Sequence, residues 1–354
     1  MEGILALGFS DIIEWIRTNW AMVAAIVVTG SIAFGIYFIL PYYVNIVLNI
    51  FCDTPPPLLV NLLDYQRIDG EHVQFRSFDG MSLQGIWLNP PKNVKIKGTI
   101  IFCHEYGSDM HSAARYTRHL IESGYRVFSF DFRAHGKSKS PGYQLVQWPS
   151  DKELCDALGA IAHVRQQLEA EGTSTEIGIF GISRGAGVSL LAAQADPDIK
   201  AVMCDGAFCT QTTLISYMKR WVHLFAKIRL VYENHPDFFW RFLCRRVINK
   251  AQKKLKRRFP SVRKAVQSLD NQAVFYIHGK RDSYIKVEHS KALHAVTPGN
   301  KFLWIVPKAK HNQSVIIQPE QYQARTLAFF DKYLANEPIA EQTINEDKVI
   351  QNIA

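Results

Sequence analysis

Ser183 stands in a five-residue motif that could make its hydroxyl a nucleophile. The motif, Gly-Ile-Ser-Arg-Gly from Gly181 to Gly185, follows the apolar run 177–180 and precedes a helix-like stretch, 186–195. A strand, a sharp turn and a helix are the setting in which G-x-S-x-G forms a nucleophile elbow. The two glycines suit this turn, because without a Cβ they let the strand and the helix approach closely. The motif needs partners, because a chain of this length contains it by chance roughly one time in ten.

A base and an acid that could activate this serine follow it in the chain. Asp282 stands in the loop behind the apolar run 273–278, and His311 stands in the loop behind the next run, 301–307. Each therefore lies just beyond the carboxyl end of an expected strand, where open α/β sheets place their ligand chemistry. The order serine, acid, histidine is also the one that accompanies this elbow. We predict a triad in which Ser183 attacks, His311 is the base and Asp282 orients the base.

Each partner also has an ordinary role when it is taken alone. A loop aspartate usually caps a turn, and a lone loop histidine is usually a surface residue. The alternative acid is Asp205, which ends the apolar run 201–205 and whose simpler role is hydrogen bonding at a strand end. The shared order and position favour Asp282.

Two further segments resemble motifs of the α/β-hydrolase superfamily, especially serine hydrolases similar to monoglyceride lipases, serine aminopeptidases and membrane-anchored hydrolase-domain proteins. Residues 102–108, Phe-Cys-His-Glu-Tyr-Gly-Ser, resemble the H-G-x-x-S turn after the third strand, and residues 131–138 resemble the D-x-R-G-x-G-x-S segment after the fourth. The resemblance covers roughly residues 74–333. It implies that the backbone N–H groups of Tyr106 and Arg184 form the oxyanion hole.

The chain departs from those motifs at two positions, Glu105 and Ala134, where the family commonly has glycine. Glu105 would bring a carboxylate to a site that stabilises negative charge, so its side chain should point away or pair with a cation. The resemblance implies structural roles for His104 and His135. The histidines around this segment lack zinc-type spacing, and we expect neither a metal nor an organic cofactor.

The alternation of expected strands and helices predicts an α/β fold with a mostly parallel, doubly wound sheet. A hairpin is expected at 71–78 and 82–89, around Asp79-Gly80. Continuous apolar runs are typical of buried parallel strands, and they occur at 99–104, 125–132, 177–182, 201–205, 275–278 and 302–306. Helical stretches lie at 112–122, 150–170, 184–195, 287–295 and 319–333. The resemblance makes this the α/β-hydrolase fold.

The N-terminal region has no charged residue from Ala21 to Cys52, which is long enough to cross a bilayer of about 30 Å. We predict one membrane helix, roughly 20–40, in a single-pass membrane protein. Pro41 should kink or end it, and the run to Phe51 should lie near the interface or extend the span. Before it, an amphipathic segment on the membrane surface is suggested by Ile4, Leu5, Ile12, Ile13, Trp15 and Ile16.

A cleaved signal peptide and a buried hairpin are the alternatives to a membrane helix in this apolar run. Asp11 and Glu14 disfavour the signal peptide, because they stand where net positive charge is required. Arg17 before the span favours a cytoplasmic N-terminus, whereas six cysteines without disulfide-like spacing favour a catalytic domain in a reducing compartment. The side of the membrane stays open.

An insert at 209–270 occupies the place of the family's helical cap and is strongly basic. It carries a net charge of +12, while the rest of the chain sums to −3. Two amphipathic helices are expected in it, one with an apolar face from Leu214 to Ile228 and one from Phe239 to Leu255. Binding of anionic lipid headgroups is predicted for Lys253, Lys254, Arg257 and Arg258. The alternatives are a solvated basic face and nucleic-acid binding, and no nucleic-acid motif accompanies the charge.

These observations divide the chain into an amphipathic segment (1–19), a membrane anchor (20–52), a hydrolase domain (53–335) and a polar tail (336–354). We predict a membrane-anchored serine hydrolase that cleaves esters or thioesters of a lipid-like acyl substrate, closer to carboxylesterases, lipases and lysophospholipases than to peptidases. A serine peptidase or aminopeptidase is the near alternative, because the same acyl transfer chemistry cleaves amides. A catalytically silent scaffold at the membrane is the other.

Overall fold

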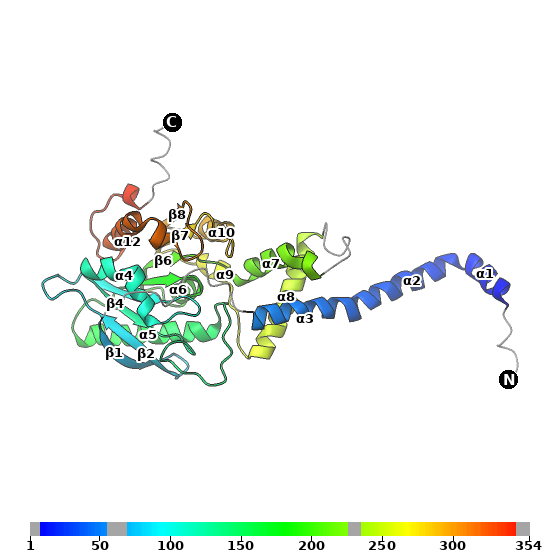
Figure 1. The fold of residues 1–354 in the computed structure, drawn as a ribbon, viewed down its shortest axis with the longest axis horizontal. Coiled ribbons are helices and arrows are strands. Elements are labelled where there is room, and N and C mark those ends of the chain that lie inside the picture. Colours follow the sequence, from blue (N-terminus) through cyan, green and yellow to red (C-terminus); the bar gives the residue numbers. More distant parts are fainter. Residues whose placement is uncertain (1–7, 55–68, 226–234, 345–354) are drawn as a thin grey trace, which may run out of the picture.

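A computed structural model describes residues 8–54, 69–225 and 235–344 of the chain. It consists of an α/β body from which a helical rod extends to the N-terminal end (Figure 1). Parts of three sequence predictions lie outside the described residues. They are Ile4 and Leu5 of the amphipathic segment, Ile228 of the first cap helix, and residues 345–354 of the polar tail.

The body is built on one eight-stranded sheet with the order β1-β2-β4-β3-β5-β6-β7-β8. β1 pairs with β2, and β2 with β4, in antiparallel fashion, and all the other neighbours are parallel, which confirms the mostly parallel sheet and the N-terminal hairpin. The strands are Glu71–Arg76, Ser82–Leu88, Gly98–Cys103, Tyr125–Phe130, Ile177–Ile182, Ile199–Asp205, Ala273–Gly279 and Lys301–Val306.

Helices cover both faces of the sheet, so the central strands are buried on both sides, as expected from their unbroken apolar runs. One core cluster lies under α5, α6, α9 and α10, and the other lies under α4 and α12. The helices of the body are α4 (Ala113–Glu122), α5 (Asp151–Ala170), α6 (Arg184–Ala195), α9 (Val262–Val266), α10 (Glu288–Val296), α11 (Ser314–Ile317) and α12 (Pro319–Tyr333), with 3-10 turns at Met110–Ser112 and Glu341–Thr343. The cap between β6 and β7 contains α7 (Thr210–Phe225) and α8 (Asp237–Leu255).

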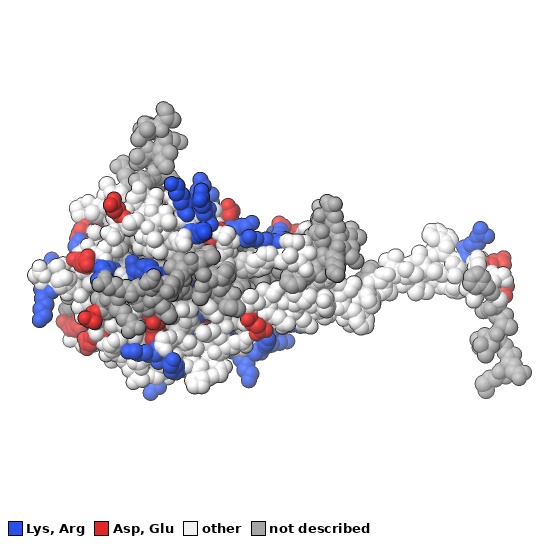
Figure 2. All heavy atoms as spheres, in the orientation of Figure 1, with Lys and Arg blue, Asp and Glu red and all other residues white. Residues whose placement is uncertain are grey.

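The rod consists of α1 (Phe9–Thr18), α2 (Trp20–Phe34), a π-helical segment η1 (Gly35–Ile39) and α3 (Leu40–Asp53). Its middle part carries no charged side chain and stands clear of the body (Figure 2). Among the described helices, none is long and apolar enough on its own to span a bilayer; one pair, Ser10–Thr18 with Trp20–Ser31, meets the length and composition of a span but is bent by 87°.

The helix does not end at Pro41. It continues as α3, and the π-helical segment stands just before the proline. Proline has no N–H to donate to the carbonyl four residues earlier, so a local change of helix type there is expected. Leu40 accordingly donates its N–H to the carbonyl of Gly35, five residues back.

The second half of α3 packs on the body. Phe51 stacks on Trp148 with ring centroids 4.9 Å apart, and the Trp148 indole donates to the Phe51 carbonyl at 3.0 Å. Val44, Phe51 and Cys52 are buried, and Lys250 and Lys254 of α8 reach Asn45 and Asp53. The C-terminal end of the uncharged run therefore packs against the rest of the protein.

Candidate active site

Ser183 occupies the sharp turn between β5 and α6. Its φ is +53°, a left-handed conformation that few non-glycine residues adopt, as expected at a nucleophile elbow. Both flanking glycines are required by space: a Cβ at Gly185 would lie 2.1 Å from the carbonyl oxygen of Cys103, and one at Gly181 would lie 2.4 Å from that of Gly185. The β5 turn thus holds the serine at the carboxyl edge of the sheet.

The structure brings Ser183, His311 and Asp282 into one hydrogen-bonded chain. Ser183 Oγ lies 2.8 Å from His311 Nε2, and His311 Nδ1 lies 2.6 Å from Asp282 Oδ2. Each of the three residues is only 7% exposed. Since a carboxylate can only accept, His311 Nδ1 carries a proton and Nε2 is left to accept the serine proton.

Asp282 is fixed by its own loop. Its Oδ1 accepts the backbone N–H groups of Tyr284 at 2.9 Å and Ile285 at 2.8 Å. Burial alone would raise the pKa of the Asp282 carboxyl, but the two neighbouring imidazoles, His311 and His278, outweigh it and hold the pKa below its usual value. The acid therefore stays ionised while it orients the imidazole.

Asp205, the alternative acid, makes hydrogen bonds to residues other than His311. Its backbone carbonyl accepts the N–H of Ser183 at 2.7 Å, and its Oδ1 accepts the hydroxyl of Ser314 at 3.2 Å. Burial raises its pKa to about 7. The position beside His311 Nδ1 is taken by Asp282, so the geometry favours Asp282 as the acid.

His278 belongs to the site although the sequence analysis did not assign it a role. It is fully buried at the end of β7, and its Nε2 lies 3.3 Å from Asp282 Oδ2 and 2.8 Å from the carbonyl of Ile285. Its Nδ1 lies 2.7 Å from the hydroxyl of Ser290. His278 therefore contacts the same oxygen of Asp282 as His311 does and helps to position the carboxylate. Its place near the end of an apolar strand, four positions before the acid, was the available signal, but this place does not specify the contact with Asp282.

The predicted oxyanion donors lie on two adjoining elements, Tyr106 in the loop after β3 and Arg184 at the start of α6. The Arg184 side chain joins these elements. It is fully buried, and its guanidinium lies 5.5 Å from the centre of the Tyr106 ring and 5.3 Å from that of Phe132. It also faces the Glu153 carboxylate at 3.7 Å. We infer that this cation holds the Tyr106 loop against the elbow.

The two departures from the family motifs are accommodated locally. The Glu105 carboxyl lies 3.4 Å from the hydroxyls of Ser112 and Tyr116, and burial raises its pKa, which favours the neutral form. Ala134 adopts the left-handed conformation of the missing glycine, with φ +59°.

The two motif histidines make buried backbone contacts. His104 accepts the N–H of Phe132 at 3.1 Å and donates to the carbonyl of Glu105 at 2.7 Å. His135 donates to the carbonyl of Arg133 and accepts from Arg184 at 3.2 Å, and burial lowers its pKa to about 3. Both are therefore neutral structural residues. Within the described ranges, no group of three or more His, Cys, Asp or Glu side chains is arranged to hold a metal ion.

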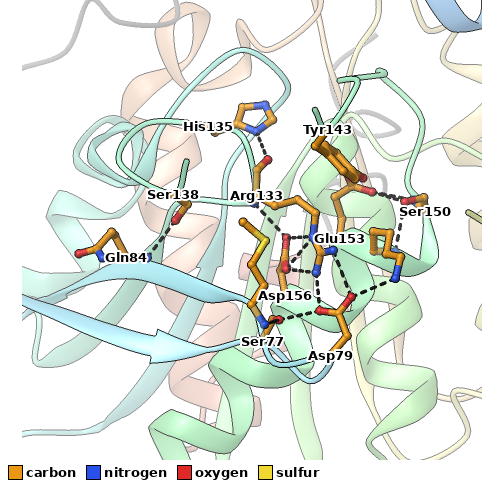
Figure 3. A network of polar contacts seen from close by, with 12 residues as sticks. Ser77, Asp79, Gln84, Arg133, His135, Ser138, Tyr143, Ser150, Glu153 and Asp156 are labelled. Atoms are coloured by element: carbon orange, nitrogen blue, oxygen red, sulfur yellow. Dashed lines mark hydrogen bonds and ion pairs between the residues drawn. The ribbon is translucent and has the colours of Figure 1, made fainter. Parts of the chain in front are cut away.

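A network of ion pairs and hydrogen bonds joins the β1–β2 turn, the loop after β4 and α5 (Figure 3). Arg133 binds Asp156 of α5 at 2.6 Å and Asp79 of the β1–β2 turn at 2.7 Å. Glu153, one turn before Asp156, accepts from Tyr143 at 2.8 Å and faces Arg184. Through Arg184, the first residue of α6, the network connects the hairpin, the loop after β4 and α5 to the residue next to Ser183.

We expect Arg133→Met to lower the free energy of unfolding by about 3–5 kcal/mol, because it leaves the fully buried Asp156 carboxylate without its cation. Urea unfolding of the full chain, followed by tryptophan fluorescence, measures this change. The matched control is Lys152→Met, which removes a half-exposed partner of Asp79 in the same network and should cost less than about 1 kcal/mol. Equal losses in the two variants would contradict a dominant role for the buried pair.

The four cap residues predicted to bind lipid headgroups do not form one exposed set. Arg257 is buried, and its guanidinium lies 4.0 Å from the centre of the Tyr143 ring and donates to the carbonyl of Gln144, so its assignment to a membrane-binding surface was wrong. Lys254 is exposed but pairs with Asp53 at 3.2 Å, at the end of α3 farthest from α2. Lys253 and Arg258 are exposed.

This fold and this serine elbow define an α/β-hydrolase. A family model described as serine aminopeptidase, S33 (Hydrolase_4), matches residues 94–314, and the chain belongs to this family of hydrolases. Among curated proteins, the chain is 27% identical over 248 residues to the uncharacterized protein YfhR of Escherichia coli O157:H7, covering 68% of this chain and 73% of that protein. It is 25% identical over 285 residues to the uncharacterized protein YqkD of Bacillus subtilis, covering 75% and 85%.

Solved structures with the same fold include an esterase and a peptidase. The esterase Pf2001 of Pyrococcus furiosus is 23% identical with a TM-score of 0.56, covering 79% of this chain and 98% of that chain. The acylaminoacyl peptidase of Pyrococcus horikoshii is 17% identical with a TM-score of 0.57, covering 81% and 45%. At these identities the likeness establishes the fold alone.

Proposed function

We propose that this protein is a membrane-anchored serine hydrolase that cleaves an ester or thioester of a lipid-like acyl substrate. The observation that carries the proposal is the hydrogen-bonded chain from Ser183 through His311 to Asp282. An exposed, uncharged α2 that leaves the body supports the anchor and, with it, a substrate drawn from the membrane.

The reaction begins when Ser183 Oγ attacks the substrate carbonyl and His311 Nε2 takes the serine proton. The N–H groups of Tyr106 and Arg184 stabilise the oxyanion of the tetrahedral intermediate. The intermediate collapses to an acyl-enzyme, and His311 gives its proton to the departing alcohol or thiol. Water then gives a proton to His311 and attacks the acyl carbon, and His311 returns this proton to Ser183 Oγ as the acid departs, which regenerates both residues. Throughout, Asp282 holds His311 in the tautomer that presents Nε2 to the serine.

Peptide hydrolysis is the second candidate, and the family description favours it. The same acyl-enzyme forms from an amide, with an amine as leaving group. Whether the enzyme cleaves esters or peptides depends on the leaving group that it accepts and on the site that binds the acyl group.

Rates of hydrolysis of esters, thioesters and aminoacyl amides test whether the protein is an esterase or a peptidase. We expect the full chain to hydrolyse esters and thioesters of one acyl group with a kcat/KM at least about tenfold above that of the aminoacyl amides, corresponding to about 1.4 kcal/mol of transition-state discrimination. Faster cleavage of aminoacyl amides would favour the peptidase. No turnover of any substrate, together with no labelling by a fluorophosphonate, would favour the silent scaffold. Alkaline carbonate extraction tests the anchor in parallel, because an inserted helix stays with the membrane pellet.

A further inference from the structure

An apolar cavity of about 400 Å³ lies between the N-terminal helix and the cap. Aliphatic and aromatic side chains of four elements, η1, α3, α7 and α8, dominate its walls. Ile39 of η1 and Val47 of α3 face it from the N-terminal side, Tyr217 and Val222 face it from α7, and Leu243 faces it from α8. Each helix contributes residues three or four positions apart. Residues at this spacing form the apolar face that a helix normally packs against its neighbours.

The size and lining of this cavity point to an apolar ligand. Protein interiors are close-packed, and an unfilled apolar void costs stability. The volume falls within the range of small-molecule pockets, about 300–1,000 Å³. Because an apolar lining offers water few hydrogen-bond partners, such a space favours hydrocarbon over water.

The N-terminal wall lies outside the segment that the family model matches. Residues 35–50, which form it, precede the segment matched by the family model, 94–314. The wall includes the π-helical segment, and such irregular turns are frequent at functional sites. Gly35 borders the cavity, and a Cβ built there meets no atom within 4 Å, so this side is open.

The outer end of the cavity is lined by Gly35 and Ile39 of η1, the segment that joins α2 to α3. Both η1 and the cap carry exposed apolar side chains: Tyr37 and Phe38 on η1, Leu224 on α7, and Phe238 and Phe242 on α8. If α2 is inserted in a bilayer, these side chains contact lipid, and the cavity is continuous with the hydrocarbon.

The inner end of the cavity approaches the catalytic histidine. Tyr217 lines the cavity, and its hydroxyl donates to the carbonyl of Tyr284 at 3.2 Å. The rings of Tyr217 and Tyr284 are 5.9 Å apart, and the Tyr284 ring meets His311 edge-on at 5.2 Å. Two aromatic side chains therefore separate the cavity from the base.

We propose that this cavity binds the long acyl chain of the substrate, so that the N-terminal helix forms one wall of the binding site as well as the anchor. The inference rests on the proposed function, because it takes the ester to be the group cleaved at Ser183. The chain lies between α3, α7 and α8, and its carboxyl end faces Tyr217, the cavity residue that is linked through Tyr284 to His311.

Chain-length dependence in the full-length protein tests the proposal. We expect kcat/KM to rise from p-nitrophenyl butyrate to p-nitrophenyl laurate, by up to about fourfold for each methylene that is buried. Val47→Trp and Val222→Trp fill the cavity from two different helices. Each should lower the laurate value by about tenfold or more and leave the butyrate value within about twofold, because the lost space is worth several buried methylenes.

Asn49→Trp is the matched control, since it adds the same side chain at an exposed position of α3 outside the cavity. It should leave the laurate-to-butyrate ratio unchanged. Retained butyrate hydrolysis shows that the tryptophan variants are folded. An unchanged ratio in both cavity variants would overturn the proposal.

Binding of cis-parinaric acid to the Ser183→Ala protein, followed by its fluorescence, gives a readout that needs no turnover. We expect Val47→Trp to weaken this binding by about tenfold, and unchanged binding would overturn the proposal. If the wild-type protein hydrolyses no ester while Val47→Trp still weakens binding, the proposed function fails and the cavity stands as an acyl-binding site.

Discussion

Ser183→Ala is expected to lower kcat by at least about 10⁴-fold and to abolish labelling by a fluorophosphonate. The alanine removes the only atom of the site that forms a bond to the acyl carbon, so the acyl-enzyme cannot form. His311 and the oxyanion donors remain, and they leave at most a slow attack by water. Labelling of the full chain, read on a gel, and the rate of ester hydrolysis give the two measurements.

Ser189→Ala is a matched control for this prediction. Ser189 is a buried serine on α6, the helix that follows Ser183, but its hydroxyl donates to the carbonyl of Gly185 at 2.9 Å. Labelling should therefore persist in Ser189→Ala. A Ser183→Ala protein that is still labelled as fast as the wild type would remove Ser183 from the role of nucleophile.

The elbow and its partners could be predicted because each depends on local sequence and on one rule of sheet geometry. An apolar run, a serine between two glycines and a helix specify the turn at Ser183 without knowledge of the rest of the chain. Asp282 and His311 follow the neighbouring parallel strands β7 and β8, whose carboxyl ends meet at one edge.

Other features could not be predicted, because they depend on contacts between distant segments. The uncharged run before residue 53 has the same composition whether lipid or protein covers it, and only the structure shows Phe51 on Trp148. Arg257 resembles its basic neighbours, yet the Tyr143 ring buries its guanidinium. His278 has an unremarkable place at a strand end, and its closeness to Asp282 arises from the fold of the following loop.

Asp282→Asn is expected to lower kcat by about 10⁴-fold while leaving the fold and the Ser183 hydroxyl in place. The Asp282 carboxylate accepts the His311 Nδ1 proton at 2.6 Å, and this leaves Nε2 free to accept from Ser183. An asparagine can instead present its amide N–H to Nδ1, which moves the imidazole proton to Nε2 and removes the base. Asp205→Asn is the control, and it should cost far less activity, because Asp205 contacts Ser314 and Ser183 N–H rather than His311. A larger loss in Asp205→Asn than in Asp282→Asn would assign the acid to Asp205.

The same substitution should change how stability depends on pH. The pKa of Asp282 is lower in the folded protein than its ordinary value, which is about 3.9 for aspartate. The folded state therefore binds this proton less readily than the unfolded state, so the contribution of Asp282 to stability is complete above that ordinary value and is lost as the pH falls below it. Urea unfolding of wild type between about pH 5 and pH 3 should show this loss, and Asp282→Asn, which cannot titrate there, should show a shallower decline. Parallel declines in the two proteins would mean that Asp282 is not held ionised by its two histidines. The kinetic role assigned to it would then lose its electrostatic basis, because only an ionised acid fixes the required tautomer of His311.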